Sequence, residues 1–148
     1  MEKLITINNI DETISLGKRI GELLKPHMLI TLNGDLGAGK TTFTKGIGKG
    51  LNIKRIINSP TFTILKQYQG TLGLSHFDAY RLEGESDDLG FEEIIDSDDV
   101  CVVEWSEFIE DILPRERLEI VIKRIDDNKR EFVLNPIGKQ YELLVEEI

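Results

Sequence analysis

The sequence predicts an α/β domain in which helices enclose a mixed sheet of parallel and antiparallel strands in three layers. The strongest indication is an apolar run at residues 28–32, which is followed by a glycine-rich loop and then by a helical pattern. Two pairs of strand-like runs are also joined by short polar connections. Such connections favour antiparallel hairpins, because parallel strands need a long crossover. We expect one domain over residues 1–148, since this length is sufficient for a single core.

The first part of the chain predicts strand, helix, strand, loop and helix in that order. Residues 3–7 are typical of a short strand. Residues 11–24 have helical apolar spacing, and Pro26 ends that helix. Residues 28–32 form the buried strand. The helix after the loop covers residues 42–51, with Phe43, Ile47 and Leu51 on one face.

The second part of the chain supplies the antiparallel strands and the remaining helices. We expect hairpins from two pairs of runs, 61–68 with 74–78 and 118–125 with 131–134. A further buried strand at residues 100–104 ends in an acid. The expected helices lie at residues 86–90, 91–95, 106–113 and 138–148.

Composition and charge restrict the classes of function. The chain has 18 Lys and Arg against 27 Asp and Glu, a net charge of −9, which disfavours a large independent nucleic-acid footprint. The one basic concentration follows the loop, at Lys45, Lys49, Lys54 and Arg55. A solvated face is the favoured interpretation of these residues, and contact with an acidic partner or RNA is the alternative. The acidic stretch at residues 83–99 is either solvated surface or a site for a basic partner.

The sequence favours a cytoplasmic protein. No apolar run approaches the ~18 residues that span a bilayer, and no signal peptide is evident at the N-terminus. The single cysteine, Cys101, lies in an apolar run and is expected to be a buried thiol.

The loop at residues 34–41, G-D-L-G-A-G-K-T, matches the phosphate-loop pattern in its required strand–loop–helix context. Glycine leaves the backbone bare and free to adopt positive φ, so that successive N–H groups can surround phosphates. The helix after the loop adds unpaired N–H groups and the positive end of its dipole. Lys40 is expected to reach the β- and γ-phosphates, and Thr41 to ligate Mg²⁺. The expected nucleotide-binding residues are Asp35, Leu36, Gly37, Ala38, Gly39, Lys40, Thr41 and Thr42.

Hydrolysis of ATP also requires acids that organise a metal ion and position water. Asp78 and Glu104 each end a predicted strand, at the edge of the sheet where α/β domains bind ligands. His76 shares a strand face with Asp78 and is a candidate to orient the site, or else a buried structural histidine. Trp105 is expected near the nucleotide. Arg81 is equally compatible with phosphate neutralisation and with a surface ion pair.

Two motifs typical of GTPases are interpreted as chance matches. Residues 87–90, D-D-L-G, follow a polar stretch and not a buried strand. Residues 128–131, N-K-R-E, resemble a guanine-reading motif, but they occupy a hairpin turn that we expect to lie far from any loop able to reach a base.

The ordered set of motifs resembles the TsaE family of small bacterial ATPases over nearly the whole chain. The segments that carry this resemblance are G-D-L-G-A-G-K-T-T at 34–42, S-P-T-F-T at 59–63, H-F-D-A-Y-R-L at 76–82 and V-E-W at 103–105. The resemblance implies a P-loop NTPase-like fold and a Mg²⁺-dependent ATPase that supports threonylcarbamoyladenosine formation in tRNA. Its implied partners are the TsaB and TsaD proteins, with TsaD as the transferase and the ATPase as a switch that resets the assembly.

The resemblance also assigns roles to particular residues. Lys40, Asp78 and Glu104 correspond to catalytic positions, and Thr41, Asp78 and Glu104 to Mg²⁺ positions. Trp105 corresponds to a tryptophan of the nucleotide site, and residues 59–63 to a switch-like loop. We expect tRNA to be reached through the assembly and not independently, and we allow for weak self-association. The alternatives left open are a small-molecule or nucleotide kinase and a nucleotide-sensing binding module.

Overall fold

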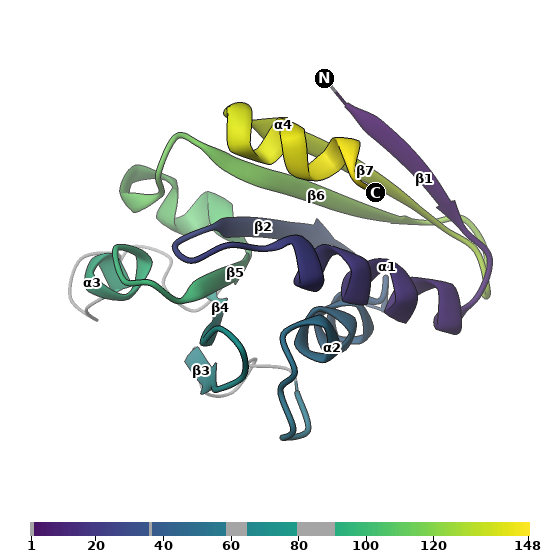
Figure 1. The fold of residues 1–148 in the computed structure, drawn as a ribbon. Helices are drawn as coiled ribbons and strands as arrows, with labels where there is room; N and C mark the ends of the chain where they lie inside the picture. The colour runs from purple at the N-terminus through teal and green to yellow at the C-terminus, as the bar shows by residue number, and fades with distance from the viewer. Residues whose placement is uncertain (1, 36, 59–64, 80–90) are drawn as a thin grey trace.

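A computed structural model of the chain describes residues 2–35, 37–58, 65–79 and 91–148 (Figure 1). In this part of the chain seven strands form one sheet in the order β1-β7-β6-β2-β5-β4-β3. The strands are β1 (Lys3–Ile7), β2 (Leu29–Gly34), β3 (Leu65–Tyr68), β4 (Leu74–Asp78), β5 (Val100–Glu104), β6 (Arg117–Arg124) and β7 (Arg130–Ile137). The helices are α1 (Ile10–Leu23), α2 (Lys40–Gly50), α3 (Phe91–Ile95), the 3₁₀ helix η2 (Ser106–Ile112) and α4 (Lys139–Glu146).

The sheet is mixed, as predicted. Strands β6, β2, β5 and β4 run parallel at its centre, whereas the pairs β1–β7, β6–β7 and β3–β4 are antiparallel. Both expected hairpins are therefore present, with β3 described from Leu65 onward. Because β2, β5 and β4 are parallel, their carboxyl ends meet at one edge of the sheet.

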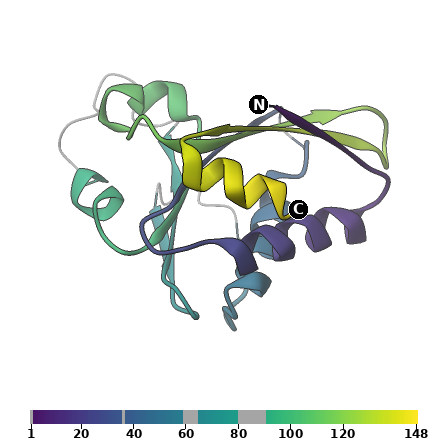
Figure 2. The same cartoon turned by 45° about the horizontal axis from the view of Figure 1, so that its top comes forward.

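Two apolar clusters cover the two faces of the sheet. One cluster joins α1, α2 and α4 to the sheet through side chains such as Ile20, Phe43 and Tyr141. The other joins α3 and η2 to the opposite face through Phe91 and Ile109. Helices therefore cover both faces, which confirms the three-layer α/β fold (Figure 2).

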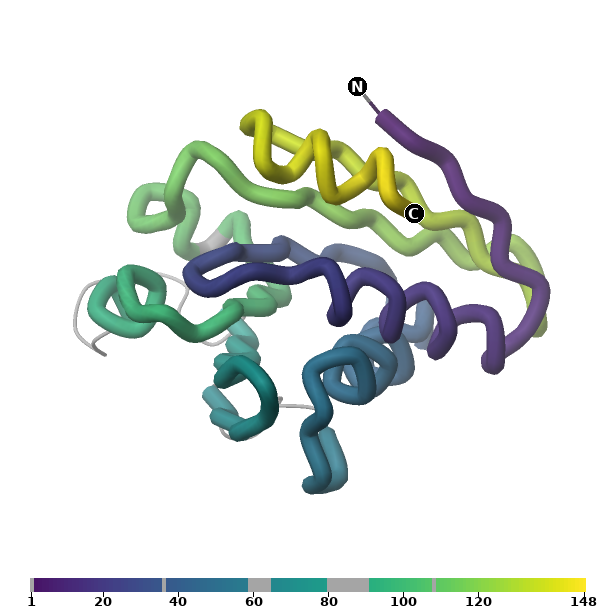
Figure 3. Tube along the Cα trace, viewed as in Figure 1, coloured from purple at the N-terminus to yellow at the C-terminus, as the bar shows by residue number. Residues whose placement is uncertain are grey.

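Glycines at the contact between α1 and α2 allow the two helices to pack closely. A Cβ atom at Gly17 would lie 2.4 Å from the carbonyl oxygen of Phe43, and one at Gly46 would lie 2.4 Å from that of Ile14. The backbones approach closely because neither glycine has a side chain, and Figure 3 shows the two helices side by side along the chain trace. This contact fixes the position of α2, the helix that begins at the phosphate loop.

The predicted elements differ from the observed ones mainly at their ends. Helix α2 begins at Lys40 and not at Thr42, and β7 continues to Ile137, beyond the predicted end at Leu134. The expected helix at 86–90 and the first part of the strand at 61–68 lie outside the described residues. No helix in the described part of the chain combines the length and apolarity needed to cross a membrane.

Candidate nucleotide-binding site

The phosphate loop connects the end of the central strand β2 to the start of α2. Gly37 and Gly39 have φ angles of 80° and 108°, which glycine adopts without strain. A Cβ atom on either residue would meet nothing within 4 Å, so the space beside both backbones is open. The N-cap residue of α2 is Gly39, and among the described residues no side chain caps this end of the helix. The first-turn N–H groups of α2 are therefore available to an anion.

Lys40 is the first residue of α2, and its ammonium group is held at the base of the loop. Its Nζ donates a hydrogen bond to the carbonyl oxygen of Gly34 at 2.7 Å. The same Nζ lies 3.9 Å from Oε1 of Glu104 and 5.1 Å from the centre of the Trp105 ring. The lysine and Glu104 side chains are only 12% and 7% exposed, so water screens their interaction weakly.

His76 and Glu104 form a buried pair below the loop. Nε2 of His76 lies 2.6 Å from Oε2 of Glu104, and the histidine side chain is fully buried. Nδ1 of His76 is buried without a hydrogen-bond partner among the described residues. A proton on Nδ1 would be an unpaired buried donor, so Nε2 is the ring nitrogen that donates to the carboxylate. His76 thus holds one oxygen of Glu104 and leaves Oε1 facing Lys40.

Asp78 lies beside Glu104 at the carboxyl edge of the sheet. Asp78 and Glu104 are direct partners in the register of the parallel strands β4 and β5, and Leu32 of β2 is the next partner of Glu104. Taken as whole residues, side chain and backbone together, Asp78 and Glu104 are each 5% exposed. The structure therefore brings together the two acids that the sequence proposed, next to the strand that carries the phosphate loop.

Trp105 follows Glu104 in a left-handed conformation, with φ 59° and ψ 46°, and η2 begins immediately after it. A buried arginine of β6 anchors η2: Arg117 donates to the carboxylates of Glu110 and Glu119 and to the carbonyl oxygen of Pro114. The two carboxylates raise the pKa of Arg117, although burial alone would lower it. These contacts tie η2, the helix that begins directly after Trp105, to β6.

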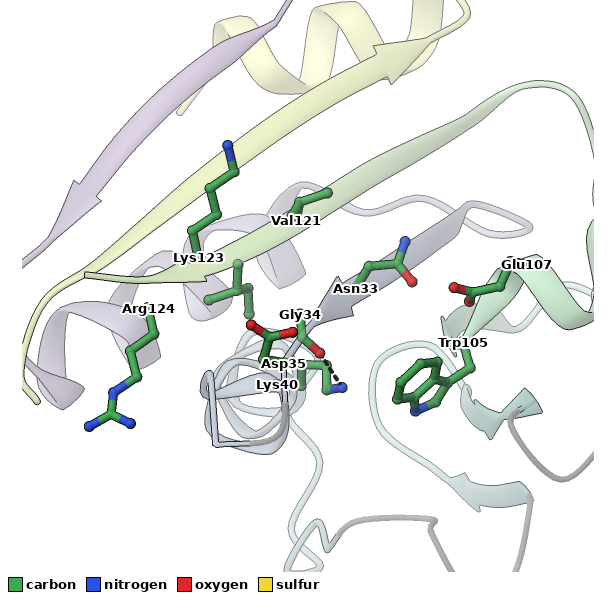
Figure 4. Close-up of a pocket in the computed structure, with 10 residues that line it drawn as sticks. Asn33, Gly34, Asp35, Lys40, Trp105, Glu107, Val121, Lys123 and Arg124 are labelled. Carbon is green, nitrogen blue, oxygen red and sulfur yellow. Dashed lines mark hydrogen bonds between the residues drawn. The ribbon is translucent and has the colours of Figure 1, made fainter. Parts of the chain in front are cut away.

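A hollow of about 370 Å³ opens beside Lys40 and Trp105 (Figure 4). Figure 4 shows the lysine and the indole approaching each other from α2 and from the start of η2. Residues at the ends of β2 and β6 line the rest of the hollow. The lining residues are Asn33, Gly34, Asp35, Lys40, Trp105, Glu107, Val121, Ile122, Lys123 and Arg124.

The β6–β7 hairpin corrects one expectation. Residues 128 and 129 lie in the hairpin turn and residues 130 and 131 begin β7, but this end of the hairpin does not lie far from the phosphate loop. Arg130 donates from Nε to the carbonyl oxygen of Ala38 at 2.9 Å and from Nη2 to that of Gly37 at 3.4 Å. Sequence reasoning missed Arg130, Lys123 and Arg124, because only the pairing of the strands brings this hairpin to the loop.

The other predicted residues are distributed as follows. Thr41 and Thr42 lie in the first turn of α2, partly buried, and Asp35 is exposed in the loop. Leu36, Arg81 and residues 59–63 lie outside the described part of the chain. The side chains of Lys45, Lys49, Lys54 and Arg55 are exposed, and Cys101 is buried as expected. Among the residues that the structure describes, no group of three or more His, Cys, Asp or Glu side chains could hold a metal ion.

Comparison with known proteins gives consistent matches. The family model described as "Threonylcarbamoyl adenosine biosynthesis protein TsaE" matches residues 7–132. The chain is 53% identical over 141 residues to the tRNA threonylcarbamoyladenosine biosynthesis protein TsaE of Bacillus subtilis, covering 95% of the chain and 89% of the relative. It is 40% identical over 125 residues to the protein of that name from Treponema pallidum, covering 83% and 93%.

A solved structure has the same fold. The crystal structure of YdiB from Bacillus subtilis superposes with a TM-score of 0.88 at 45% sequence identity, covering 99% of this chain and 93% of that one. The likeness extends over the whole sheet and its helices.

Proposed function

The chain belongs to the TsaE family of threonylcarbamoyl adenosine biosynthesis proteins, and we propose that it is a Mg²⁺-dependent ATPase acting as a nucleotide-driven switch in that tRNA modification. One observation carries the proposal. An open, positive-φ glycine loop and an uncapped helix N-terminus meet a lysine and two buried acids at a single edge of the sheet. A phosphate chain needs the loop and the lysine, and its hydrolysis needs the acids.

The residues present fit ATP. Beside Gly37 and Gly39 there is open space where a side chain would otherwise lie, so phosphate oxygens can approach the backbone. Lys40 follows Gly39 directly, and its Nζ would leave the carbonyl oxygen of Gly34 and the carboxylate of Glu104 to meet a phosphate. The hollow beside Trp105 offers about 370 Å³ for the rest of the nucleotide.

The donor set also fits Mg²⁺, which prefers hard oxygen ligands and commonly takes several of them from water and phosphates. Thr41 would supply a hydroxyl oxygen, and Asp78 would act on the ion through water. A bound Mg²⁺ ion would neutralise charge on the β- and γ-phosphates.

Glu104 is the candidate that polarises the attacking water. Its Oε2 is fixed by His76, and its Oε1 lies at the longer distance of 3.9 Å from Nζ of Lys40. When Lys40 turns to the phosphates, Oε1 becomes free to accept a hydrogen bond from water. Asp78, at the neighbouring register position, is then left to organise the metal.

The proposed partners are the TsaB and TsaD proteins, with tRNA reached through their assembly. The net charge of −9 supports an indirect route to tRNA, because a polyanion is repelled by a strongly acidic protein. The role proposed for this chain is to reset the assembly between turnovers while TsaD performs the transfer.

A kinase is the main competitor, and the structure weakens one argument for it. Kinases usually need an arginine-rich lid, and the close pair Arg115 and Arg117 are the candidates for one. Arg117, however, is buried and bound to Glu110 and Glu119. Labelled γ-phosphate separates the two functions: an ATPase releases all label as inorganic phosphate, whereas transfer to any member of an acceptor panel supports the kinase. A variant that binds ATP without hydrolysing it separates a switch that needs turnover from a binding module, by whether tRNA modification persists.

A further inference from the structure

The hairpin between β6 and β7 touches the phosphate loop although 92 residues separate Arg130 from Ala38. The guanidinium group of Arg130 divides its donors between two sides. Nη1 donates to the carbonyl oxygens of Asp126 and Lys129 within the hairpin, at 2.6 and 2.9 Å. Nε and Nη2 donate to Ala38 and Gly37 in the loop. A planar guanidinium with five N–H donors can bridge two segments in this way, whereas a lysine cannot.

The turn that carries Arg130 is itself held in one conformation. One carboxylate oxygen of Asp126 accepts the backbone N–H groups of Lys129 and Asn128 at 2.7 and 2.8 Å. These hydrogen bonds, that from Lys129 first, keep the pKa of Asp126 below its ordinary value. Arg130 therefore projects from a locally ordered turn.

The contacts with the loop have a geometric consequence. The peptide between Ala38 and Gly39 is trans and planar, so its C=O and N–H groups point in opposite directions. Arg130 holds the Ala38 carbonyl on the hairpin side, which directs the Gly39 N–H away from the hairpin. That N–H has no hydrogen-bond partner within the described part of the chain, whereas the N–H of Ala38 is already bonded to the carbonyl oxygen of Asp35.

We propose that Arg130 is a positioning residue of the phosphate loop: it fixes the Ala38–Gly39 peptide so that the Gly39 N–H is presented to phosphate. The inference rests on the proposed function, in which this loop binds the phosphates of ATP. Arg130 touches no nucleotide in this scheme and acts only through the backbone of the loop. The β6–β7 hairpin then forms part of the nucleotide site through this backbone contact, and not through the resemblance of residues 128–131 to a guanine-reading motif.

The test measures Mg-ADP affinity by calorimetry and steady-state ATP hydrolysis in the full-length chain. We expect Arg130→Gln to weaken Mg-ADP binding about tenfold, since charge-assisted hydrogen bonds that order the loop are lost. The KM for ATP rises similarly while kcat changes less, because the loop holds phosphates in the ground state and the transition state alike. Arg130→Lys retains the charge and makes at most one of the two contacts, so its affinity lies between those of wild type and Arg130→Gln.

A matched control and a second readout keep the result specific. Arg19 also donates to a backbone carbonyl, that of Glu147 at 2.9 Å, but far from the loop, so Arg19→Gln should bind Mg-ADP as wild type does. The amide NMR signal of Gly39, recorded without nucleotide, should shift in Arg130→Gln and Arg130→Lys and stay in place in Arg19→Gln. This signal tests the inference even if Arg130→Gln folds poorly, because Arg130→Lys can be measured in its place.

Two results overturn the inference: Mg-ADP affinity within twofold of wild type in Arg130→Gln, or an equal loss in Arg19→Gln, which would indicate general destabilisation. If the wild-type chain binds no Mg-ADP, the proposed function fails. The Gly39 amide signal then decides the positioning role by itself, and an unmoved signal refutes it.

Discussion

Replacing Glu104 by Gln should separate nucleotide binding from hydrolysis. The substitution keeps the shape of the side chain and removes the charge that faces Lys40 at 3.9 Å and His76 at 2.6 Å. Two unit charges about 4 Å apart near a protein surface attract each other by about 4 kcal/mol. ATP must draw Lys40 away from this attraction, so its loss favours binding.

The expected magnitudes follow from that competition. We expect ATP affinity in Glu104→Gln to lie between the wild-type value and about tenfold tighter. The gain is limited because, in the wild type, contacts of Lys40 with the phosphates already offset part of the Lys40–Glu104 attraction that binding gives up. The single-turnover rate should fall at least ~100-fold, because an amide cannot accept a proton from water as a carboxylate can.

The assay combines calorimetry with Mg-ATP and quenched single-turnover hydrolysis. Glu22→Gln, an exposed change on α1, is the matched control and should resemble wild type in both measurements. Full turnover in Glu104→Gln would refute the role assigned to this carboxylate. Binding weakened tenfold or more would refute the competition for Lys40.

Four further predictions follow from the same structure. Lys40→Ala should weaken ATP binding by at least ~10-fold in calorimetry, since the phosphates lose their only cation from α2's first turn, and unchanged affinity would exclude Lys40 from the site. Asp78→Asn should raise the Mg²⁺ concentration needed for half-maximal hydrolysis; an unchanged Mg²⁺ dependence would remove Asp78 from the metal site. Gly46→Ala should lower the free energy of unfolding in urea by about 1–3 kcal/mol, despite a helix-propensity gain of up to ~1 kcal/mol, because its Cβ would meet the Ile14 carbonyl. Gly48→Ala, whose Cβ would clash with the δ-carbon at the end of the Ile57 side chain and not with backbone, should cost less, and equal losses would contradict the backbone contact. Burial and then Asp99 raise the pKa of Cys101 to about 12, so iodoacetamide at pH 8.5 should label the folded protein at least ~100-fold more slowly than the unfolded chain. Because the folded pKa is the higher one, the contribution of this thiol to stability is complete below the unfolded pKa and declines between about pH 9 and 12; rapid labelling of the folded protein would contradict the burial.

Local pattern was enough to predict most of the fold and the centre of the site. The strand at Val100–Glu104 was predicted to the residue, because four apolar side chains run directly into an acid there. Asp78 and Glu104 were each predicted at the carboxyl end of a strand near the phosphate loop, and the structure adds that they are direct register partners. The shared strand face of His76 and Asp78 made His76 a candidate to orient the site, but its contact with Glu104 was not predicted, since no spacing rule joins two residues 28 positions apart on different strands.

The part that could not be predicted depends on long-range register. Arg130 looked like a residue of an isolated turn, and its reach to the phosphate loop depends on β6 lying next to β2 in the sheet. The close packing of α1 against α2 likewise could not be predicted from local sequence. Gly17 and Gly21 were visible on one face of the predicted helix, but their role depends on the backbone of α2 lying directly against them.

Phosphate release from Mg-ATP tests the central claim most directly. It would be measured for the purified chain alone, with TsaB, TsaD and tRNA added, and again with Lys40→Ala under both conditions. The account predicts slow release by the chain alone, strong stimulation by the added partners, and loss of that stimulation in Lys40→Ala. If the chain binds nucleotide but its slow phosphate release does not change when TsaB, TsaD and tRNA are added, the partner-coupled switch is contradicted.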